Sequence, residues 1–180
     1  MEKLMKYILS SLLIVSLSIF ADENYKYEPE GNPAEYYIGT FNRGKDLDDL
    51  VDWYGKFSDW AEDKGVYDDM GVALLTPFFN ADLNSIDVVW VNMFSTQTEQ
   101  YAALNAWMTQ GGSKLMNSLP VTNSRQMNTY QWVISNPSEP EDGDMMMAVY
   151  SDCKFEEGFD GRKVYDLYKD FAIYAQSQGD

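Results

Sequence analysis

The chain has 180 residues and a formal net charge of −16 at pH 7, with 13 Lys and Arg residues against 29 Asp and Glu residues. It has no histidine and a single cysteine, which excludes histidine-based triads, histidine-ligated zinc or haem, and any disulfide within the chain. The acidity argues against binding to a nucleic-acid backbone, while a hydrophobic content of 45% is enough for a folded core.

The first residues have the order of a secretory signal peptide. Two early lysines precede an apolar run over residues 7–20, and small and then charged residues follow. This run is shorter than the roughly 20 residues that a membrane span needs. We therefore expect residues 1–21 to be a signal peptide cleaved after Ala21, with cleavage after Ser18 or an uncleaved anchor as alternatives. The mature protein is then periplasmic or secreted, without a stable membrane anchor.

The mature chain begins with a strand and a helix. Residues 22–34 are a polar leader in which two prolines and a glycine disfavour regular structure. Residues 36–41 are aromatic and β-branched, which predicts a strand. Asp46 is a candidate N-cap for a helix whose apolar residues recur at helical spacing, and Gly65 supplies a stop signal.

Two more strands, a second helix and a last strand follow. Residues 72–79 and 86–94 read as strands, and Thr96 with a glutamate three residues later predicts the capping box of a helix. Residues 127–134 read as the last strand. This order predicts an α+β fold, in which residues 35–135 form a ferredoxin-like β-α-β-β-α-β unit with an antiparallel sheet and both helices on one face.

The two faces of the strand over residues 86–94 differ in character. One face carries Trp90 and Asn92, and the other carries aliphatic side chains such as Val89 and Val91. We expect the aliphatic face to pack against the helices, and the Trp90 face to meet a second sheet or to line a pocket. Because both faces are apolar, an uncovered one predicts self-association.

Four side chains form the candidate ligand pocket. Alternation places Tyr130 and Trp132 on one side of the last strand, and Trp90 and Asn92 on one side of the earlier one. Such a lining suits a flat or apolar small molecule bound between sheets. Inter-sheet packing is the alternative interpretation of the same residues.

A second, incomplete copy of the unit is expected after a linker over residues 136–144. Residues 145–151 read as a strand and residues 162–178 as a helix. The helix repeats the pattern D-x-Y-x-x-F-x-x-x-A-x-x-x-G of the first helix, starting at Asp166 in place of Asp52. Residues 145–180 are therefore predicted to be the β-α start of a second ferredoxin-like unit, and we expect the chain to be a fragment.

The element order, the strand sequence WVNMF at residues 90–94 and the repeat resemble the dimeric α/β barrel superfamily. This superfamily includes antibiotic-biosynthesis-monooxygenase-like and stress-response barrel proteins. The resemblance implies two ferredoxin-like units packed sheet against sheet, either as a dimer or as a tandem repeat. It carries over no catalytic residue, and the sequence identifies no metal ligand or cofactor.

Three functions stay open at this point. The leading hypothesis is an exported acidic protein that binds a small apolar or aromatic ligand without catalysis. The alternatives are a cofactor-free monooxygenase-like enzyme and a structural or interaction module with no ligand. Cys153 is unusual in an exported chain with no other cysteine, and we expect it to pair with a cysteine in a missing segment.

Overall fold

The computed structural model describes residues 25–78, 85–135 and 145–179. The predicted signal peptide and the predicted linker lie outside these residues. The chain divides into two compact units, Pro29–Asn136 and a second that combines Met1–Glu28 with Pro137–Asp180. Within the described ranges, no helix has the length and hydropathy that a membrane crossing requires.

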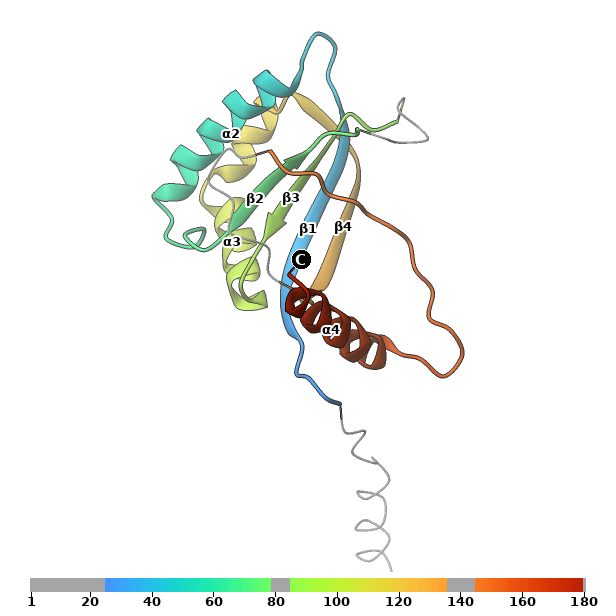
Figure 1. Ribbon diagram of the computed structural model, residues 1–180. Helices are drawn as coiled ribbons and strands as arrows, with labels where there is room; N and C mark the ends of the chain where they lie inside the picture. The colour runs from blue at the N-terminus through green and yellow to red at the C-terminus, as the bar shows by residue number, and fades with distance from the viewer. Residues whose placement is uncertain (1–24, 79–84, 136–144, 180) are drawn as a thin grey trace, which may run out of the picture. The chain divides into compact units, whose positions relative to one another are not determined.

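The unit Pro29–Asn136 is built on one antiparallel sheet. Its four strands lie in the order β2-β3-β1-β4, with two α-helices alongside (Figure 1). The predicted α+β class with an antiparallel sheet is confirmed. In chain order the elements are β1 (Glu30–Phe41), α2 (Leu47–Glu62), β2 (Gly71–Leu75), β3 (Val88–Met93), α3 (Gln97–Thr109), the 3-10 helix η1 (Gly112–Ser118) and β4 (Val121–Val133).

Strand β1 begins at Glu30, inside the segment predicted to be a leader. Proline is tolerated there because the start of β1 pairs only with β4, and pairing with β3 begins at Ala34. The Pro33 carbonyl accepts a hydrogen bond from the backbone N–H of Phe94 at 3.0 Å, so the Pro33 nitrogen faces the same edge, beyond the last residue of β3. No bond to β4 is lost, and the prediction of an irregular leader up to residue 34 is wrong.

Both α-helices of this unit begin at the predicted caps. The Asp46 side chain accepts the backbone N–H of Asp49 at 3.2 Å. The Thr96 hydroxyl accepts the backbone N–H of Glu99 at 3.2 Å, and the Glu99 carboxylate accepts the backbone N–H of Thr96 at 3.1 Å. These bonds satisfy N–H groups that have no partner within the helix.

The face of β3 that packs on the helices is not the one predicted. The Trp90 ring meets Trp53 of α2 at 5.5 Å and Phe57 of α2 at 5.8 Å between centroids, both in edge-to-face geometry. Val91 instead belongs to a separate cluster with Ala34 and Tyr36. The expectation that the aliphatic face meets the helices is therefore wrong. The physical reason is that the aromatic rings of α2 make edge-to-face contacts with the Trp90 indole, which short aliphatic side chains do not offer.

Strand β4 begins at Val121, six positions before the predicted start at residue 127. Its first half is polar and exposed, and carries no alternating apolar signal. It is nevertheless a strand because Val121 pairs with Phe41 and the ladder to β1 continues to Val133, opposite Glu30. Backbone pairing along an edge does not require apolar side chains.

In the second unit, the predicted helix is present and the predicted strand is not. Helix α4 (Gly161–Ser177) begins at Asp160, whose side chain accepts the backbone N–H of Lys163 at 2.9 Å. Residues 145–156 have no regular secondary structure, and Met145 is 99% exposed. The strand prediction for residues 145–151 is wrong: a strand needs a neighbour for its N–H and C=O groups, and no described strand pairs with this segment.

Helix α4 is bound by the residues just before β1, within the same unit. The Asp166 carboxylate accepts the backbone N–H of Lys26 at 2.7 Å and that of Tyr27 at 3.1 Å. The Arg162 guanidinium donates to the Tyr27 carbonyl at 2.8 Å. Residues 26 and 27 thus hold helix α4 through hydrogen bonds.

Candidate functional site

A cavity of about 330 Å³ lies between the sheet and helices α2 and α3, within the unit Pro29–Asn136. Its volume is near the lower end of the range for small-molecule sites, about 300–1,000 Å³. For scale, an apolar cavity of about 150 Å³ is enough to hold benzene. The space therefore suits one small molecule of one or two rings.

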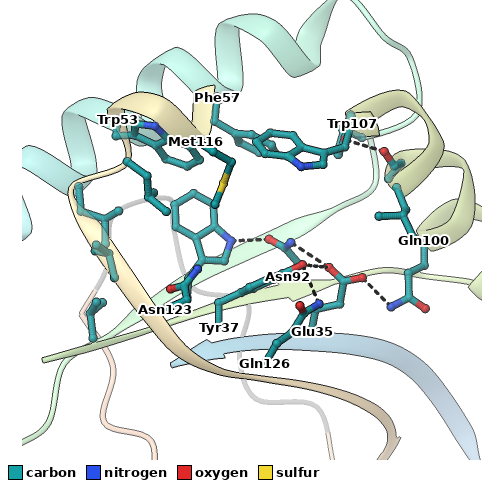
Figure 2. Close-up of a pocket in the computed structure, with 18 of the residues that line it drawn as sticks. Glu35, Tyr37, Trp53, Phe57, Asn92, Gln100, Trp107, Met116, Asn123 and Gln126 are labelled. Atoms are coloured by element: carbon teal, nitrogen blue, oxygen red, sulfur yellow. Dashed lines mark hydrogen bonds between the residues drawn. The ribbon is translucent and has the colours of Figure 1, made fainter. Parts of the chain in front are cut away.

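One side of the cavity is aromatic. Trp53 and Phe57 come from α2 and Trp107 from α3 (Figure 2), with Phe57 and Trp107 6.0 Å apart between ring centroids. The Trp53 indole N–H donates to the Leu115 carbonyl at 3.1 Å, which satisfies its polar atom and fixes the ring. These side chains present a preformed, largely apolar surface to the cavity.

The other side of the cavity is organised around one buried carboxylate. Glu35 of β1 is only 8% exposed. Its Oε1 accepts a hydrogen bond from the Gln100 amide at 2.9 Å. Its Oε2 accepts one from the Tyr37 hydroxyl at 2.9 Å and one from the Asn92 amide at 3.2 Å. None of the ion pairs among the described residues includes Glu35, so this carboxylate is held by neutral donors.

The hydrogen bonds continue outward from the carboxylate. The Trp90 indole N–H donates to Asn92 Oδ1 at 2.5 Å, and the Gln126 amide donates to the Tyr37 hydroxyl at 3.3 Å. Asn92 therefore uses both ends of its amide, its nitrogen on Glu35 and its oxygen on Trp90. A buried amide needs such partners, which explains how the asparagine is accommodated on this face. Figure 2 shows Asn92 between the aromatic rings and Glu35.

The register of the sheet brings these residues together. Glu35 lies opposite Asn92, and Tyr37 lies opposite Trp90 on one side and Gln126 on the other. Since side chains of directly paired residues point to the same face, all five project toward the helices. Gln100 reaches the carboxylate from the first turn of α3.

Two tyrosines of the cavity hold their protons firmly. Burial raises the pKa of the Tyr37 hydroxyl, and the negative charge of Glu35 raises it further. The same two causes, in the same order, raise the pKa of Tyr67, whose hydroxyl donates to the Ala103 carbonyl at 2.7 Å. Both tyrosines are consequently neutral hydrogen-bond donors.

The four predicted pocket residues separate into two pairs. Trp90 and Asn92 line the cavity. Tyr130 and Trp132 do not: they lie opposite Pro33 and Gly31, past the end of β3, and are 57% and 39% exposed. The cavity seen here lies between one sheet and its helices, and the predicted pocket between two sheets stays a prediction.

Cys153 is exposed, with its Sγ 3.9 Å from the Ser151 carbonyl oxygen. The disulfide to a missing segment stays a prediction. Among the described residues, no group of three or more acidic or cysteine side chains is placed to hold a metal ion.

Sequence reasoning missed the centre of the site. Nothing in the sequence pattern marks Glu35 as a functional residue, and the same holds for Tyr37, Gln100 and Gln126. An acidic residue one position before a strand usually marks a solvated end. The available signal was the alternation of Glu35 with Tyr37, which places both on one face, but only the pairing with β3 shows that this face is covered.

The chain matches no protein-family model, and a search of the curated proteins found no match. The geometry of the cavity is therefore the basis for a functional proposal.

Proposed function

We propose that this chain is a binding protein for a small, mostly apolar or aromatic ligand, held between the sheet and helices α2 and α3. The observation that carries the proposal is the cavity of about 330 Å³ with an aromatic side and one cluster of hydrogen-bonded polar groups. Apolar lining with a few convergent polar groups is the usual composition of a small-molecule site.

The hydrogen bonds that already hold the Glu35 carboxylate favour a binding function over a catalytic one. Glu35 is the sole carboxylate among the described residues that line the cavity, and three neutral donors already hold it. A general base works best when it is free to take a proton from the substrate, whereas a fully oriented carboxylate suits recognition. A cofactor-free monooxygenase-like enzyme is the second candidate, with Glu35 as its base.

The wider setting of this site is also a proposal. The strand order β2-β3-β1-β4, with one helix after the first strand and one before the last, supports a ferredoxin-like unit of the dimeric α/β barrel type. Export through a signal peptide over residues 1–21 and self-association through the sheet stay parts of the same hypothesis. On this hypothesis the mature protein functions outside the cell or in the periplasm.

Indole is a suitable first probe because it is flat, neutral and smaller than the cavity. We expect the purified full chain to bind indole in a calorimetric titration, and the variant Ala103→Leu to bind it at least about tenfold more weakly, because Ala103 lines the cavity and a larger side chain occupies the ligand's space. Ala102→Leu, one position along the same helix and not in the lining, is the matched control.

Each outcome separates the three functions. Indole binding that Ala103→Leu weakens and Ala102→Leu does not supports a binding site in the cavity. Oxygen uptake with a bound phenol such as 1-naphthol identifies the enzyme instead. Failure of indole and of related aromatic compounds to bind contradicts the proposal and favours a structural module.

A further inference from the structure

The cavity combines an aromatic surface with a buried carboxylate that has no cationic partner among the residues that the structure describes. We propose that its ligand carries a protonated amine, which pairs with Glu35 while an aromatic or aliphatic body occupies the space beside Trp53, Phe57 and Trp107. This inference rests on the proposed function and adds the charge of the ligand to it.

The first argument is the charge balance at Glu35. Burying a carboxylate is costly unless an opposite charge or several hydrogen bonds compensate for the lost water. Glu35 is 8% exposed, and no Lys or Arg is among the described residues that line the cavity. Neutral donors orient the carboxylate without neutralising it. A cationic ligand supplies the missing charge, and the net charge of −16 draws cations towards the protein in general.

The second argument is the number of hydrogen bonds that the carboxylate still lacks. Each carboxylate oxygen has about two acceptor positions. Among the described residues, Oε2 accepts from Tyr37 and from Asn92, whereas Oε1 accepts from Gln100 alone. One acceptor position is therefore open on Oε1. An ammonium N–H fits this position with a charge-assisted hydrogen bond, which is stronger than a bond between neutral groups.

The third argument is the aromatic surface on the other side of the cavity. Indole and phenyl rings pack favourably against the aromatic or aliphatic body of a ligand. Figure 2 shows Trp53, Phe57 and Trp107 on the side of the cavity that lies across from Glu35. A molecule with an ammonium group on an apolar body can therefore pair with the Glu35 carboxylate on one side and pack against the aromatic rings on the other. An anionic ligand of the same shape is repelled by Glu35 and finds no basic side chain in the described lining.

A purely structural role for Glu35 makes a different prediction. In that case the carboxylate only connects β1, β3 and α3 through Tyr37, Asn92 and Gln100, and ligand charge has no effect on binding. Replacing Glu35 then changes the stability of the protein but not its preference among ligands.

Three probes of nearly the same shape separate these possibilities. At pH 7 tryptamine is cationic, 3-propylindole is neutral and indole-3-propionate is anionic. Calorimetric titration of the full chain is expected to give tryptamine a dissociation constant about tenfold or more below that of 3-propylindole, in line with a charge-assisted bond. Indole-3-propionate is expected to bind more weakly than either.

The variant Glu35→Gln keeps the shape of the side chain and removes its charge. We expect it to abolish the preference for tryptamine while 3-propylindole still binds, and we expect Glu30→Gln, an exposed acid on the same strand, to leave the preference intact. Circular dichroism shows whether each variant is folded, and the three-probe series on the unaltered protein decides the question even if Glu35→Gln does not fold.

Equal binding of tryptamine and 3-propylindole to the unaltered protein overturns the inference and leaves the proposed binding function standing. A preference for tryptamine that survives in folded Glu35→Gln also overturns it. Failure of all three probes to bind overturns the proposed function together with the inference.

Discussion

Glu35 shows how much one side chain depends on its surroundings. In the sequence it is one of 29 acidic residues, and most of the others that the structure describes are exposed. In the fold it is buried beside Trp90 and Asn92, and it shapes the properties of its neighbours. The raised pKa of Tyr37 is one such property, since burial and the charge of Glu35 both oppose loss of the tyrosine proton.

The raised pKa of Tyr37 predicts a dependence of stability on high pH. The hydroxyl has a pKa of 10.0 in the absence of the fold, and the folded protein holds the proton more tightly than the unfolded chain does. The raised pKa of Tyr37 therefore adds to the free energy of unfolding below pH 10. This added stability decreases as the pH rises above 10, because the unfolded chain then loses the tyrosine proton more readily than the folded protein does. We expect the free energy of unfolding, measured in urea from pH 9 to pH 11, to fall less steeply for Tyr37→Phe than for the unaltered protein.

Tyr67→Phe provides a second, independent test of the same effect. Its pKa is raised by the same two causes, so the variant is expected to lose part of the pH dependence as well. If the slopes of both variants equal that of the unaltered protein, the two hydroxyls do not titrate as the fold implies.

At the scale of elements, local signals located the helices well and the strand ends poorly. Both N-caps lie where the sequence predicted, because a cap depends on residues only three positions apart. Strand β4 starts six positions early because its ends are decided by pairing with β1. The same limit applies to residues 145–151, which have strand-like composition but no described partner.

Helices α2 and α4 share a sequence pattern, but the matching side chains have different surroundings. Phe57 in α2 is 6% exposed, whereas its counterpart Phe171 in α4 is 67% exposed. Both helices have the spacing of an amphipathic helix. Phe57 of α2 packs edge-to-face against Trp90 of the sheet.

Two glycines in the same helical layer predict opposite effects of the same substitution. Gly55 lies inside α2, and a Cβ added there meets nothing within 4 Å, so Gly55→Ala is expected to raise stability by roughly 0.5–1 kcal/mol through helix propensity. A Cβ on Gly112 comes within 2.4 Å of the Trp107 ring and 2.8 Å of the Trp60 ring. Gly112→Ala is therefore expected to lower stability by about 1–3 kcal/mol.

Urea unfolding of the two glycine variants measures both effects. Gly112→Ala also displaces a ring that lines the cavity, so we expect it to weaken indole binding, while Gly55→Ala leaves binding unchanged. Destabilisation by Gly55→Ala contradicts the open space around that position of α2. No destabilisation by Gly112→Ala contradicts the packing of η1 against the two indoles.

At the scale of the whole molecule, the proposed export makes a prediction that mass spectrometry can check. If residues 1–21 are a signal peptide, the protein recovered from its producing cell begins at Asp22, or at Ile19 if cleavage follows Ser18. Blocking cleavage with Ala21→Pro is expected to leave the uncleaved form. A soluble cytoplasmic protein that retains Met1 contradicts export.

The sequence by itself determined the chemistry that is excluded, the α+β class and the starts of the helices. These follow from composition and from interactions between near neighbours in the chain. The alternation along one strand also predicted that Trp90 and Asn92 lie on the same face, and both line the cavity. The tertiary structure alone decided which face of the sheet meets the helices, where the strands end, and that Glu35 is buried among Tyr37, Asn92 and Gln100. Those properties depend on pairing between residues far apart in the chain. Glu35 becomes the centre of a polar cluster only because β3 and α3 bring Asn92 and Gln100 within hydrogen-bond distance of it.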